Sequence, residues 1–429
     1  MKIPFRRYRG GALVEVQIND KYTEWMLFDT GASATFITDA AARRCGLRPQ
    51  LMQLRVFRLG KGEVAARPVG LDTLRVGDSA FSKKQLLAYV IPEDDPEDEY
   101  AGILGMDVIA EMGWFSVNAS HLTFHRSMPV LRSLIRLPAI VQGRRCWFPV
   151  RLGDGQPIRM IWDTGAAVNY LSPNILAAQL QRRGGKSAVV PQGRHELYAA
   201  LEDGTEEEAV IEYRRLWRFG DATLGSLSLH PLPIFQYPEV FAWGWGEYGL
   251  LGFPLLTEYE ITANFTTKRL FARRYRQRLA GTYGLALRAE ESRGTLRWFF
   301  SAVIPTEEGA PLPPHLCEIL AVDGIPVERW ETIPLIQRLM FPQARQTCSI
   351  RYFDGRRAMT NRFRAVGIAY LGLPLFWMHT IRLPRTELKF EGGYLRSRMT
   401  LEIPKQLRGV RGSRRRLYVE YRDDSWRFG

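Results

Sequence analysis

The sequence predicts a mainly β protein with two similar halves, a small α+β domain and a β-rich basic extension. Three observations predict this fold class. Short alternating apolar segments are separated by many of the 38 glycines and 25 prolines, and long helical periodicity is scarce. Hydrophobic residues make up 46% of 429 residues, enough for several buried cores. An Asp-Thr-Gly tripeptide at residues 29–31 recurs at 163–165.

The two Asp-Thr-Gly segments lie in matching surroundings. Each follows an apolar run and precedes an alanine and then β-branched or aromatic residues. A second motif, hydrophobic-hydrophobic-Gly, ends at Gly105 in the first half and at Gly252 in the second. The offsets are 163 − 29 = 134 residues for the aspartates and 252 − 105 = 147 for these glycines. Near-equal offsets with the same internal order predict a tandem repeat whose second copy has a longer loop.

Each half is expected to contain the same order of elements. In the first half these are strands at 11–18 and 23–28, a helix at 38–45, strands at 54–59, 64–68 and 71–76, and the glycine motif at 102–105. In the second half they are strands at 145–152 and 158–162, a helix at 173–181, a hairpin of 197–200 and 208–213, and the motif at 249–252. Each Asp-Thr-Gly therefore follows the return strand of a hairpin.

The pattern changes after residue 277. The expected elements there are a strand, an Asp-Gly turn and a short strand within 318–327, a helix at 331–340, a hairpin of 348–353 and 357–360, and a partial echo of 251–255 at 371–375. We therefore expect four domains, at 1–128, 129–278, 279–368 and 369–429.

Charge and cysteine usage limit the functional classes. The net charge of +14 is scattered, apart from an arginine-rich run at 408–416, so we expect a solvated basic surface and no nucleic-acid partner. The four cysteines and six histidines have no metal-ligand or disulfide spacing. Reduced thiols favour a cytoplasmic protein, and the cell envelope is the alternative if a signal peptide is missing from this start. No apolar stretch is long enough to span a bilayer.

Two aspartates held side by side can activate water. They cannot both ionise cheaply, so one keeps its proton while the other stays charged. The charged carboxylate can take a proton from water as the water attacks an amide carbonyl, and the protonated carboxyl can donate to the developing oxyanion. Asp29 and Asp163 are therefore the candidate catalytic residues, and this chemistry needs no metal or cofactor.

The neighbours of each aspartate suit this chemistry. Glycine lacks a Cβ, so the backbone can approach a carboxyl and donate N–H groups, and the threonine hydroxyls can tie the two loops together. The candidate supporting residues are Thr30, Gly31, Ala32, Thr164, Gly165 and Ala166.

At these residues the sequence resembles the aspartic peptidases, in particular the retropepsin-like group. The resemblance covers about residues 3–275, and it rests on the two Asp-Thr-Gly-Ala segments together with Ile103-Leu104-Gly105 and Leu250-Leu251-Gly252. Alanine after the glycine is closer to the retroviral and bacterial members than to pepsin. The resemblance implies two closed β-barrel lobes that form a pepsin-like pseudo-dimer in one chain. It also implies a monomer with an internal pseudo-twofold axis that hydrolyses peptide or protein substrates.

The same resemblance implies a flap hairpin over the cleft in each lobe. The candidates for substrate binding are Gly60, Lys61 and Gly62 in the first lobe, and Asp203 and Gly204 in the second. An ordinary surface hairpin is the alternative for each. Three glutamates follow the second candidate, at 206–208, which leaves open that only one flap acts.

Residues 281–366 look like a PDZ-type domain, on the basis of the strand-turn-strand at 318–327 and the helix after it. The resemblance implies that Gly284, Leu285 and Ala286 bind a C-terminal peptide ligand. The usual Gly-Asp before the strand is replaced by Leu316-Cys317-Glu318, so a degenerate domain that only packs against the rest is the alternative.

We therefore expect an aspartic-type endopeptidase. The alternative function is a non-catalytic peptide-binding protein that uses the retropepsin-like scaffold and the PDZ-like domain. A third arrangement pairs each lobe with the lobe of another molecule, which would give a dimer with two sites. A glycosidase-type use of the two carboxyls is remote, because Asp-Thr-Gly has no counterpart in that chemistry.

Overall fold

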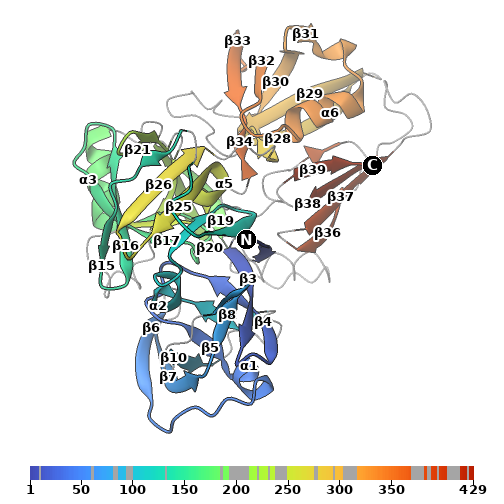
Figure 1. Cartoon of the computed structure of the whole chain (residues 1–429). Helices are drawn as coiled ribbons and strands as arrows, with labels where there is room; N and C mark the ends of the chain where they lie inside the picture. The colour runs from blue at the N-terminus through green and yellow to red at the C-terminus, as the bar shows by residue number, and fades with distance from the viewer. Residues whose placement is uncertain are drawn as a thin grey trace. The chain divides into compact units, whose positions relative to one another are not determined.

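The structure is a computed structural model of the whole chain (Figure 1). It describes residues 1–8, 11–58, 62–80, 86–92, 100–130, 133–183, 187–192, 212–219, 222–229, 232–236, 249–274, 279–292, 295–302, 316–368, 381–383, 388–393, 396–402, 416–422 and 425–429. The chain divides into two compact units. Unit 1 comprises Met1–Arg183, Asp221–His230 and Gln236–Arg276, and unit 2 comprises Gly184–Gly220, Pro231–Phe235 and Gln277–Gly429.

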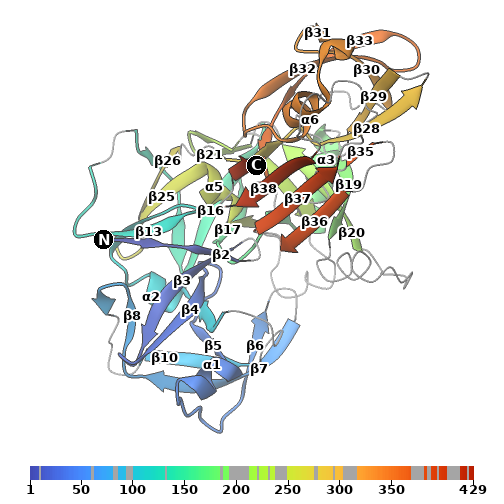
Figure 2. The ribbon, with the colours of Figure 1, turned by 90° about the vertical axis from the view of Figure 1, so that its right-hand side faces the viewer.

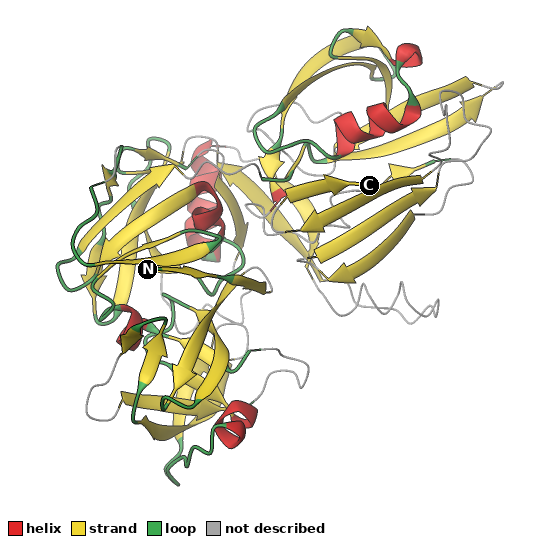
Figure 3. Ribbon diagram, turned by 45° about the vertical axis from the view of Figure 1, so that its right-hand side comes forward, coloured by secondary structure: helices red, strands yellow, loops and turns green. Residues whose placement is uncertain are grey.

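The predicted mainly β fold is confirmed. Strands dominate both units, and the described helices are short, the longest being α3 at Pro173–Arg183 (Figure 3). Within the described ranges, no helix combines the length and the apolar character needed to cross a membrane. The boundaries of the four predicted domains stay predictions.

The first copy of the repeat is a sheet with the strand order β6-β7-β10-β5-β11-β4-β3-β8-β9, to which β2 adds beside β3. Its elements are β2 (Arg6–Tyr8), β3 (Gly11–Ile18), β4 (Tyr22–Phe28), β5 (Phe36–Thr38), α1 (Asp39–Arg44), β6 (Leu54–Arg58), β7 (Gly62–Leu71), β8 (Leu74–Val76), β9 (Ser79–Ala80), β10 (Leu86–Ile91), β11 (Gly102–Leu104) and α2 (Met106–Ile109). β11 runs parallel to β4 and antiparallel to β5. It therefore lies between the strand before the first Asp-Thr-Gly and the strand after it.

Local chemistry explains two boundaries in this copy. The predicted helix at 38–45 is confirmed as α1, which begins after Thr38 because the Thr38 hydroxyl accepts a hydrogen bond from the Ala41 N–H at 3.2 Å. The predicted strand at 71–76 is divided in two. Asp72 and the residue after it form a turn there, and both of their N–H groups donate to the Asn19 side chain, at 2.9 and 3.3 Å.

The second copy repeats this arrangement. Its strands in unit 1 have the order β18-β24-β17-β16-β21-β22, and β15 pairs beside β16. The corresponding strands of the first copy have the order β5-β11-β4-β3-β8-β9, and β2 pairs beside β3. The elements are β15 (Ile140–Gln142), β16 (Arg145–Leu152), β17 (Ile158–Asp163), β18 (Tyr170–Leu171), α3, β21 (Ala222–Leu224), β22 (Leu227–Ser228), β24 (Gly249–Gly252) and α5 (Pro254–Glu258). The tandem repeat predicted from the offsets is thus a repeat of structure as well as of sequence.

The counterparts of β6, β7 and β10 are β19 (Ser187–Gln192), β20 (Glu212–Phe219) and β23 (Leu232–Gln236), which pair antiparallel in this order. Residues 193–211 separate β19 from β20, whereas residues 59–61 separate β6 from β7. This longer connection accounts for much of the larger offset of the glycine motif.

A six-stranded sheet in unit 1 takes strands from both halves. Its order is β1 (Lys2–Pro4), β13 (His121–His125), β12 (Trp114–Val117), β25 (Tyr259–Asn264), β26 (Arg269–Arg274) and β14 (Ile135–Arg136). β12 and β25 pair antiparallel at its centre. A continuous series of aromatic rings accompanies this junction: Phe28 contacts Phe115, Phe115 contacts Phe265, and Phe265 contacts Trp162, with ring centroids 6.0–6.3 Å apart.

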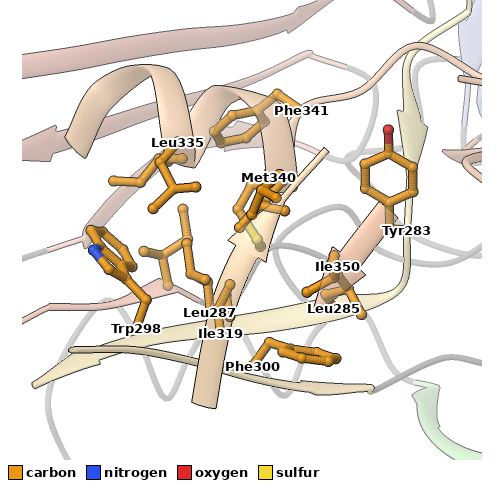
Figure 4. Close-up of a cluster of buried hydrophobic side chains, with 14 of the residues drawn as sticks. Tyr283, Leu285, Leu287, Trp298, Phe300, Ile319, Leu335, Met340, Phe341 and Ile350 are labelled. Atoms are coloured by element: carbon orange, nitrogen blue, oxygen red, sulfur yellow. The ribbon is translucent and has the colours of Figure 1, made fainter. Parts of the chain in front are cut away.

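Unit 2 contains a seven-stranded sheet with the path β33-β32-β30-β29-β28-β35, to which β31 adds beside β30, and the helix α6. The bounds are β28 (Leu285–Ser292), β29 (Thr295–Ala302), β30 (Cys317–Val322), β31 (Ile325–Pro326), the 3-10 helix η2 (Val327–Arg329), α6 (Thr332–Met340), β32 (Thr347–Phe353), β33 (Ala358–Arg364) and β35 (Ile381–Arg382). The apolar face of α6 packs on a cluster that includes Leu287, Phe300 and Ile319 (Figure 4). The predicted strand-turn-strand is present, with the left-handed turn at Asp323 (φ 51°) and Gly324 (φ 79°).

Smaller sheets complete unit 2. β27 (Gly281–Thr282) pairs with β34 (Val366–Gly367), and β36 (Leu388–Gly393), β37 (Arg396–Glu402), β38 (Arg416–Arg422) and β39 (Ser425–Phe428) form a four-stranded antiparallel sheet, whose first three strands lie side by side in Figure 2. Met399 and Val419 of this sheet belong to the same core as Leu287. The Trp426 indole N–H is shared between the carbonyls of Gly281 and Pro342, at 3.3 and 3.0 Å. The predicted echo at 371–375 lies outside the described residues.

Candidate active site

Two parallel strand pairs position the two aspartates. In the first half, β4 ends at Phe28 beside Leu104 of β11, and the Asp29 N–H donates to the Leu104 carbonyl at 3.1 Å. In the second half, β17 ends at Asp163, which lies beside Gly252 of β24. The glycines of the motif are required by close packing: a Cβ on Gly105 would lie 2.2 Å from the Ala34 carbonyl oxygen, and one on Gly252 would lie 2.5 Å from that of Val168.

Each aspartate accepts hydrogen bonds from its own loop in the same pattern. Oδ1 of Asp29 accepts from the N–H groups of Gly31 (2.7 Å) and Ala32 (3.2 Å). Oδ1 of Asp163 accepts from the N–H groups of Gly165 (3.0 Å) and Ala166 (2.9 Å). These bonds fix the inner oxygen of each carboxyl and leave the second oxygen of each group for other partners.

The structure brings Asp29 and Asp163 together. Their carboxyl groups share a side-chain hydrogen bond, and the Gly165 N–H also donates to Asp29. Each carboxyl lies against the glycine of the opposite loop. A Cβ on Gly31 would lie 2.3 Å from Cγ of Asp163, and a Cβ on Gly165 would lie 2.4 Å from Oδ2 of Asp29. The contacts are reciprocal, as a pseudo-twofold axis between the two loops requires.

The threonines tie the two loops together, as the sequence predicts. The Thr30 N–H donates to the Thr164 hydroxyl at 3.0 Å, and the Thr164 N–H donates to the Thr30 hydroxyl at 3.1 Å. Each hydroxyl in turn donates across the junction, Thr30 to the Trp162 carbonyl at 2.7 Å and Thr164 to the Phe28 carbonyl at 2.6 Å. Both threonines are fully buried, so these four bonds are shielded from water.

The two carboxyls titrate as a pair. Burial raises the pKa of Asp29, and the hydrogen bonds from Gly31, Asp163 and the other donors oppose that increase. Burial raises the pKa of Asp163 well above its usual range, and both the negative charge of Asp29 and the hydrogen bond between the carboxyls add to the increase. The pair therefore holds one shared proton to a higher pH than a free aspartate would.

The side chains that bond the glycine motif beside each aspartate loop differ between the two halves. They are not among the site residues that the sequence predicts. Asp107 accepts from the Thr35 N–H at 3.0 Å and from the Thr35 hydroxyl at 2.7 Å, and that hydroxyl accepts from the Gly105 N–H at 3.2 Å. In the second half the side-chain oxygen of Asn169 accepts directly from the Gly252 N–H at 2.8 Å. The signal was present in the sequence, because 169 − 35 = 134 is the offset of the two aspartates.

The flap candidates are only partly within the described residues. β6 and β7 form an antiparallel hairpin in which Arg58 pairs with Gly62, so Gly60 and Lys61 belong to the connection at its tip and lie outside the described residues. Asp203 and Gly204 lie outside them as well. The strands β19 and β20 before and after that second segment pair as a hairpin. The roles of both candidates stay predictions.

One backbone donor of the predicted peptide-carboxylate loop is already in use. Gly284 is buried with φ 70°, and its N–H donates to the Thr282 hydroxyl at 3.0 Å. Leu285 and Ala286 begin β28 and pair with Ala302 and Ser301 of β29. The Gly284 N–H is therefore not available to a carboxylate in this conformation. No group of three or more His, Cys, Asp or Glu residues suited to a metal ion occurs in the part of the chain that the structure describes.

Comparisons with known proteins find a match for the half of the chain that contributes Asp29. Residues 14–108 match the family model of the aspartyl proteases, and this range includes Asp29 and Asp107 but not Asp163. No curated protein matches the chain. Among solved structures, the crystal structure of an aspartic proteinase from Irpex lacteus is similar with a TM-score of 0.42 and 15% identity, over 64% of this chain and 97% of that chain.

The contact between Gly165 and Asp29 gives a direct test of the site. Gly165→Ala is expected to destabilise the fold by about 1–3 kcal/mol, because the new methyl must displace the Asp29 carboxyl. The measurement is the melting temperature. Gly70→Ala is the matched control, since nothing lies within 4 Å of a Cβ added there. Equal melting temperatures in the two variants would contradict the close packing of the dyad.

Proposed function

We propose that the protein is an aspartic-type endopeptidase that hydrolyses peptide bonds with water activated by Asp29 and Asp163. One observation carries the proposal: the repeat supplies two carboxyls, the half-buried Asp29 and the buried Asp163, that share a hydrogen bond and are held by matching backbone donors. The aspartyl protease match of residues 14–108 supports the same class.

The proposed mechanism assigns different roles to the two carboxyls. Asp29 is assigned the ionised form, and it takes a proton from a water molecule as the water oxygen attacks the peptide carbonyl. Asp163 donates its proton to the carbonyl oxygen as negative charge develops there. The proton taken by Asp29 then passes to the leaving nitrogen as the C–N bond breaks, and one hydroxyl of the tetrahedral intermediate returns its proton to Asp163 as the carboxylic acid forms. Burial makes this sequence possible at moderate pH because it raises the pKa of the proton-bearing carboxyl.

The peptide substrate is proposed to bind as an extended chain across the dyad, covered by the hairpin β6–β7. Because both aspartates come from one chain, we further propose that a monomer is sufficient for activity.

An unbiased peptide library incubated over a range of pH tests the proposal, with cleavage products identified by mass spectrometry. Wild-type protein should cleave, a pepstatin-type inhibitor should block cleavage, and Asp29→Asn should reduce kcat by about 10²–10⁴-fold or more, since the general base is lost. The exposed Asp78→Asn is the control, and it should cleave as the wild type does. Binding of library peptides without hydrolysis at any pH would overturn the proposal in favour of the non-catalytic peptide-binding protein.

A further inference from the structure

A polar network lies on one face of the six-stranded sheet of unit 1, where the two halves of the chain meet. Asn118 directly follows β12 of the first half, and Glu260 belongs to β25 of the second half. Nδ2 of Asn118 donates to Oε2 of Glu260 at 2.9 Å. Asn118 is fully buried and Glu260 is 5% exposed. A charged hydrogen bond therefore joins the two halves at a place that is shielded from water.

The neighbours of Asn118 fix the direction in which its amide points. Oδ1 accepts from the backbone N–H groups of Ser120 at 2.9 Å and His121 at 3.2 Å, and those groups can only donate. The carboxylate is held as well, because Oε1 of Glu260 accepts from the Arg273 guanidinium at 2.7 Å. The amide nitrogen must therefore face Glu260, since an inverted amide would set two oxygens against each other.

The same NH₂ group also meets the ring of a histidine. Nδ2 of Asn118 lies 3.3 Å from Nε2 of His121. Because the NH₂ group can only donate, Nε2 must accept, so the His121 ring is neutral and carries its proton on Nδ1. A proton on Nε2 would set one donor against another. Since Asn118 cannot invert its amide, protonation of His121 displaces it from Glu260.

A second histidine on the same strand makes a different kind of bond. Nε2 of His125 lies 2.8 Å from the Ser116 hydroxyl, which in turn lies 2.8 Å from the Thr262 hydroxyl of the second half. A hydroxyl can accept as well as donate, so protonated His125 keeps this bond by donating through Nε2. The link through Ser116 therefore tolerates a proton on His125, whereas the link through Asn118 does not tolerate one on His121.

The charged groups around His121 come from several strands. Residues that oppose each other in the ladders lie on the same face of the sheet. Besides Glu260 and the two histidines, the titratable and charged side chains that the ladders place on this face are Lys2, Arg136, Arg269 and Arg273. The N-terminal amine acts on His125 and lowers its pKa after burial has done so. Burial lowers the pKa of His121, Lys2 and Arg273 add to the decrease, and Glu260 opposes it.

We propose that His121, Asn118 and Glu260 form a pH-sensitive latch between the two halves, closed when His121 is neutral and open when it is protonated. A histidine held neutral stabilises the fold fully above its unfolded-state pKa of about 6.5, and this stability is lost as pH falls from there towards the lower folded-state pKa. The aromatic series from Phe28 to Trp162 lies beside the same ladder, so an open latch loosens the alignment of the two aspartate loops. The latch itself does not depend on hydrolysis.

Hydrogen exchange of the full chain at pH 7.5 and at pH 5 tests the latch. The results are compared as protection factors, which correct for the effect of pH on intrinsic exchange. In the wild type, the amides of β12 and β25 should lose about tenfold or more of their protection at pH 5, because the hydrogen bond to the Glu260 carboxylate is lost. His121→Gln should abolish this loss, since the glutamine oxygen accepts from Asn118 at both pH values.

His125→Gln is the matched control, and it should lose protection at pH 5 as the wild type does. Unchanged protection in the wild type, or the same loss in His121→Gln, would overturn the proposal. An equal rescue by His125→Gln would overturn it too, because the loss would then be a general effect of positive charge on this face.

If His121→Gln does not fold at pH 7.5, the wild type with ¹⁵N-labelled histidine replaces it. The chain has six histidines, so their ring signals can be followed individually. At pH 7.5 His121 should carry its proton on Nδ1, and β12 and β25 should lose protection over the pH range in which His121 gains its second proton. A proton on Nε2 at pH 7.5, or a loss of protection over a different range, would show that this histidine does not hold the halves together.

Discussion

Asp163→Asn is expected to raise the melting temperature at neutral pH while it abolishes peptide hydrolysis. The pKa of Asp163 in the folded protein lies well above its ordinary value of 3.8, chiefly because of burial and then because of the charge of Asp29. The folded state therefore binds this proton more tightly than the unfolded state does. The stability that this proton contributes is complete below pH 3.8 and is lost as pH rises through the folded-state pKa.

Asparagine removes this pH dependence. Its side-chain oxygen can still accept from the N–H groups of Gly165 and Ala166, and its NH₂ group can donate to Asp29 as the protonated carboxyl does. The variant should therefore be more stable than the wild type at pH 7, and the difference should shrink towards zero as pH falls to about the ordinary pKa of an aspartate. Its kcat should fall by about 10²–10⁴-fold, because the acid that serves the oxyanion is gone.

Thermal unfolding of the two proteins at intervals between pH 3 and pH 8 checks this expectation. Asp78→Asn, at an exposed position, controls for the loss of one negative charge. A melting temperature for Asp163→Asn that lies below the wild-type value at pH 7 would show that Asp163 does not carry the raised pKa.

Thr164→Val is expected to be strongly destabilising at the junction of the two loops. Valine has nearly the shape of threonine but no hydroxyl, so the Thr30 N–H and the Phe28 carbonyl would both lose their buried partner. Each unsatisfied group costs about 1–3 kcal/mol, so the free energy of unfolding should fall by about 2–6 kcal/mol. The loss also frees the loop that carries Asp29, so hydrolysis should fall with it.

Urea unfolding and amide exchange at Thr30 measure this effect. Thr164→Ser keeps the hydroxyl and removes only a methyl, so it should retain most of the stability and the slow exchange of the Thr30 amide. If valine and serine have the same effect, the crossed hydrogen bonds between the loops do not stabilise the site.

The dyad and its crossed threonines could be predicted because they depend on a short motif that recurs. Asp29 and Asp163 each lie after an apolar strand and before a glycine, and one offset relates every residue of the two loops. The Asp-Gly turn at 323–324 and the Thr38 cap were predictable for a similar reason, since turns and helix starts depend on neighbours in sequence.

Other features had no local signal. Asp107 reaches Thr35 only because β11 returns beside β4 and β5, and a carboxylate buried behind a loop belongs to no periodic pattern. The pairing of β35 with β28 joins segments far apart in the chain, and three residues such as Ile381-Arg382-Leu383 are too few to specify a register. The raised pKa values of Asp29 and Asp163 arise chiefly from burial, and for Asp163 also from the charge of Asp29, and the tripeptides alone reveal neither effect.

The series of rings from Phe28 to Trp162 bears on how the two halves stay aligned. Phe28 directly precedes Asp29, Trp162 directly precedes Asp163, and Phe115 and Phe265 join them beside the β12–β25 ladder. These ring contacts thus connect the two aspartate loops directly, and the chain segment between β13 and β14 takes no part in them. That connection acts as a tether, which keeps the two halves at a high effective concentration but does not set the distance between the carboxyls.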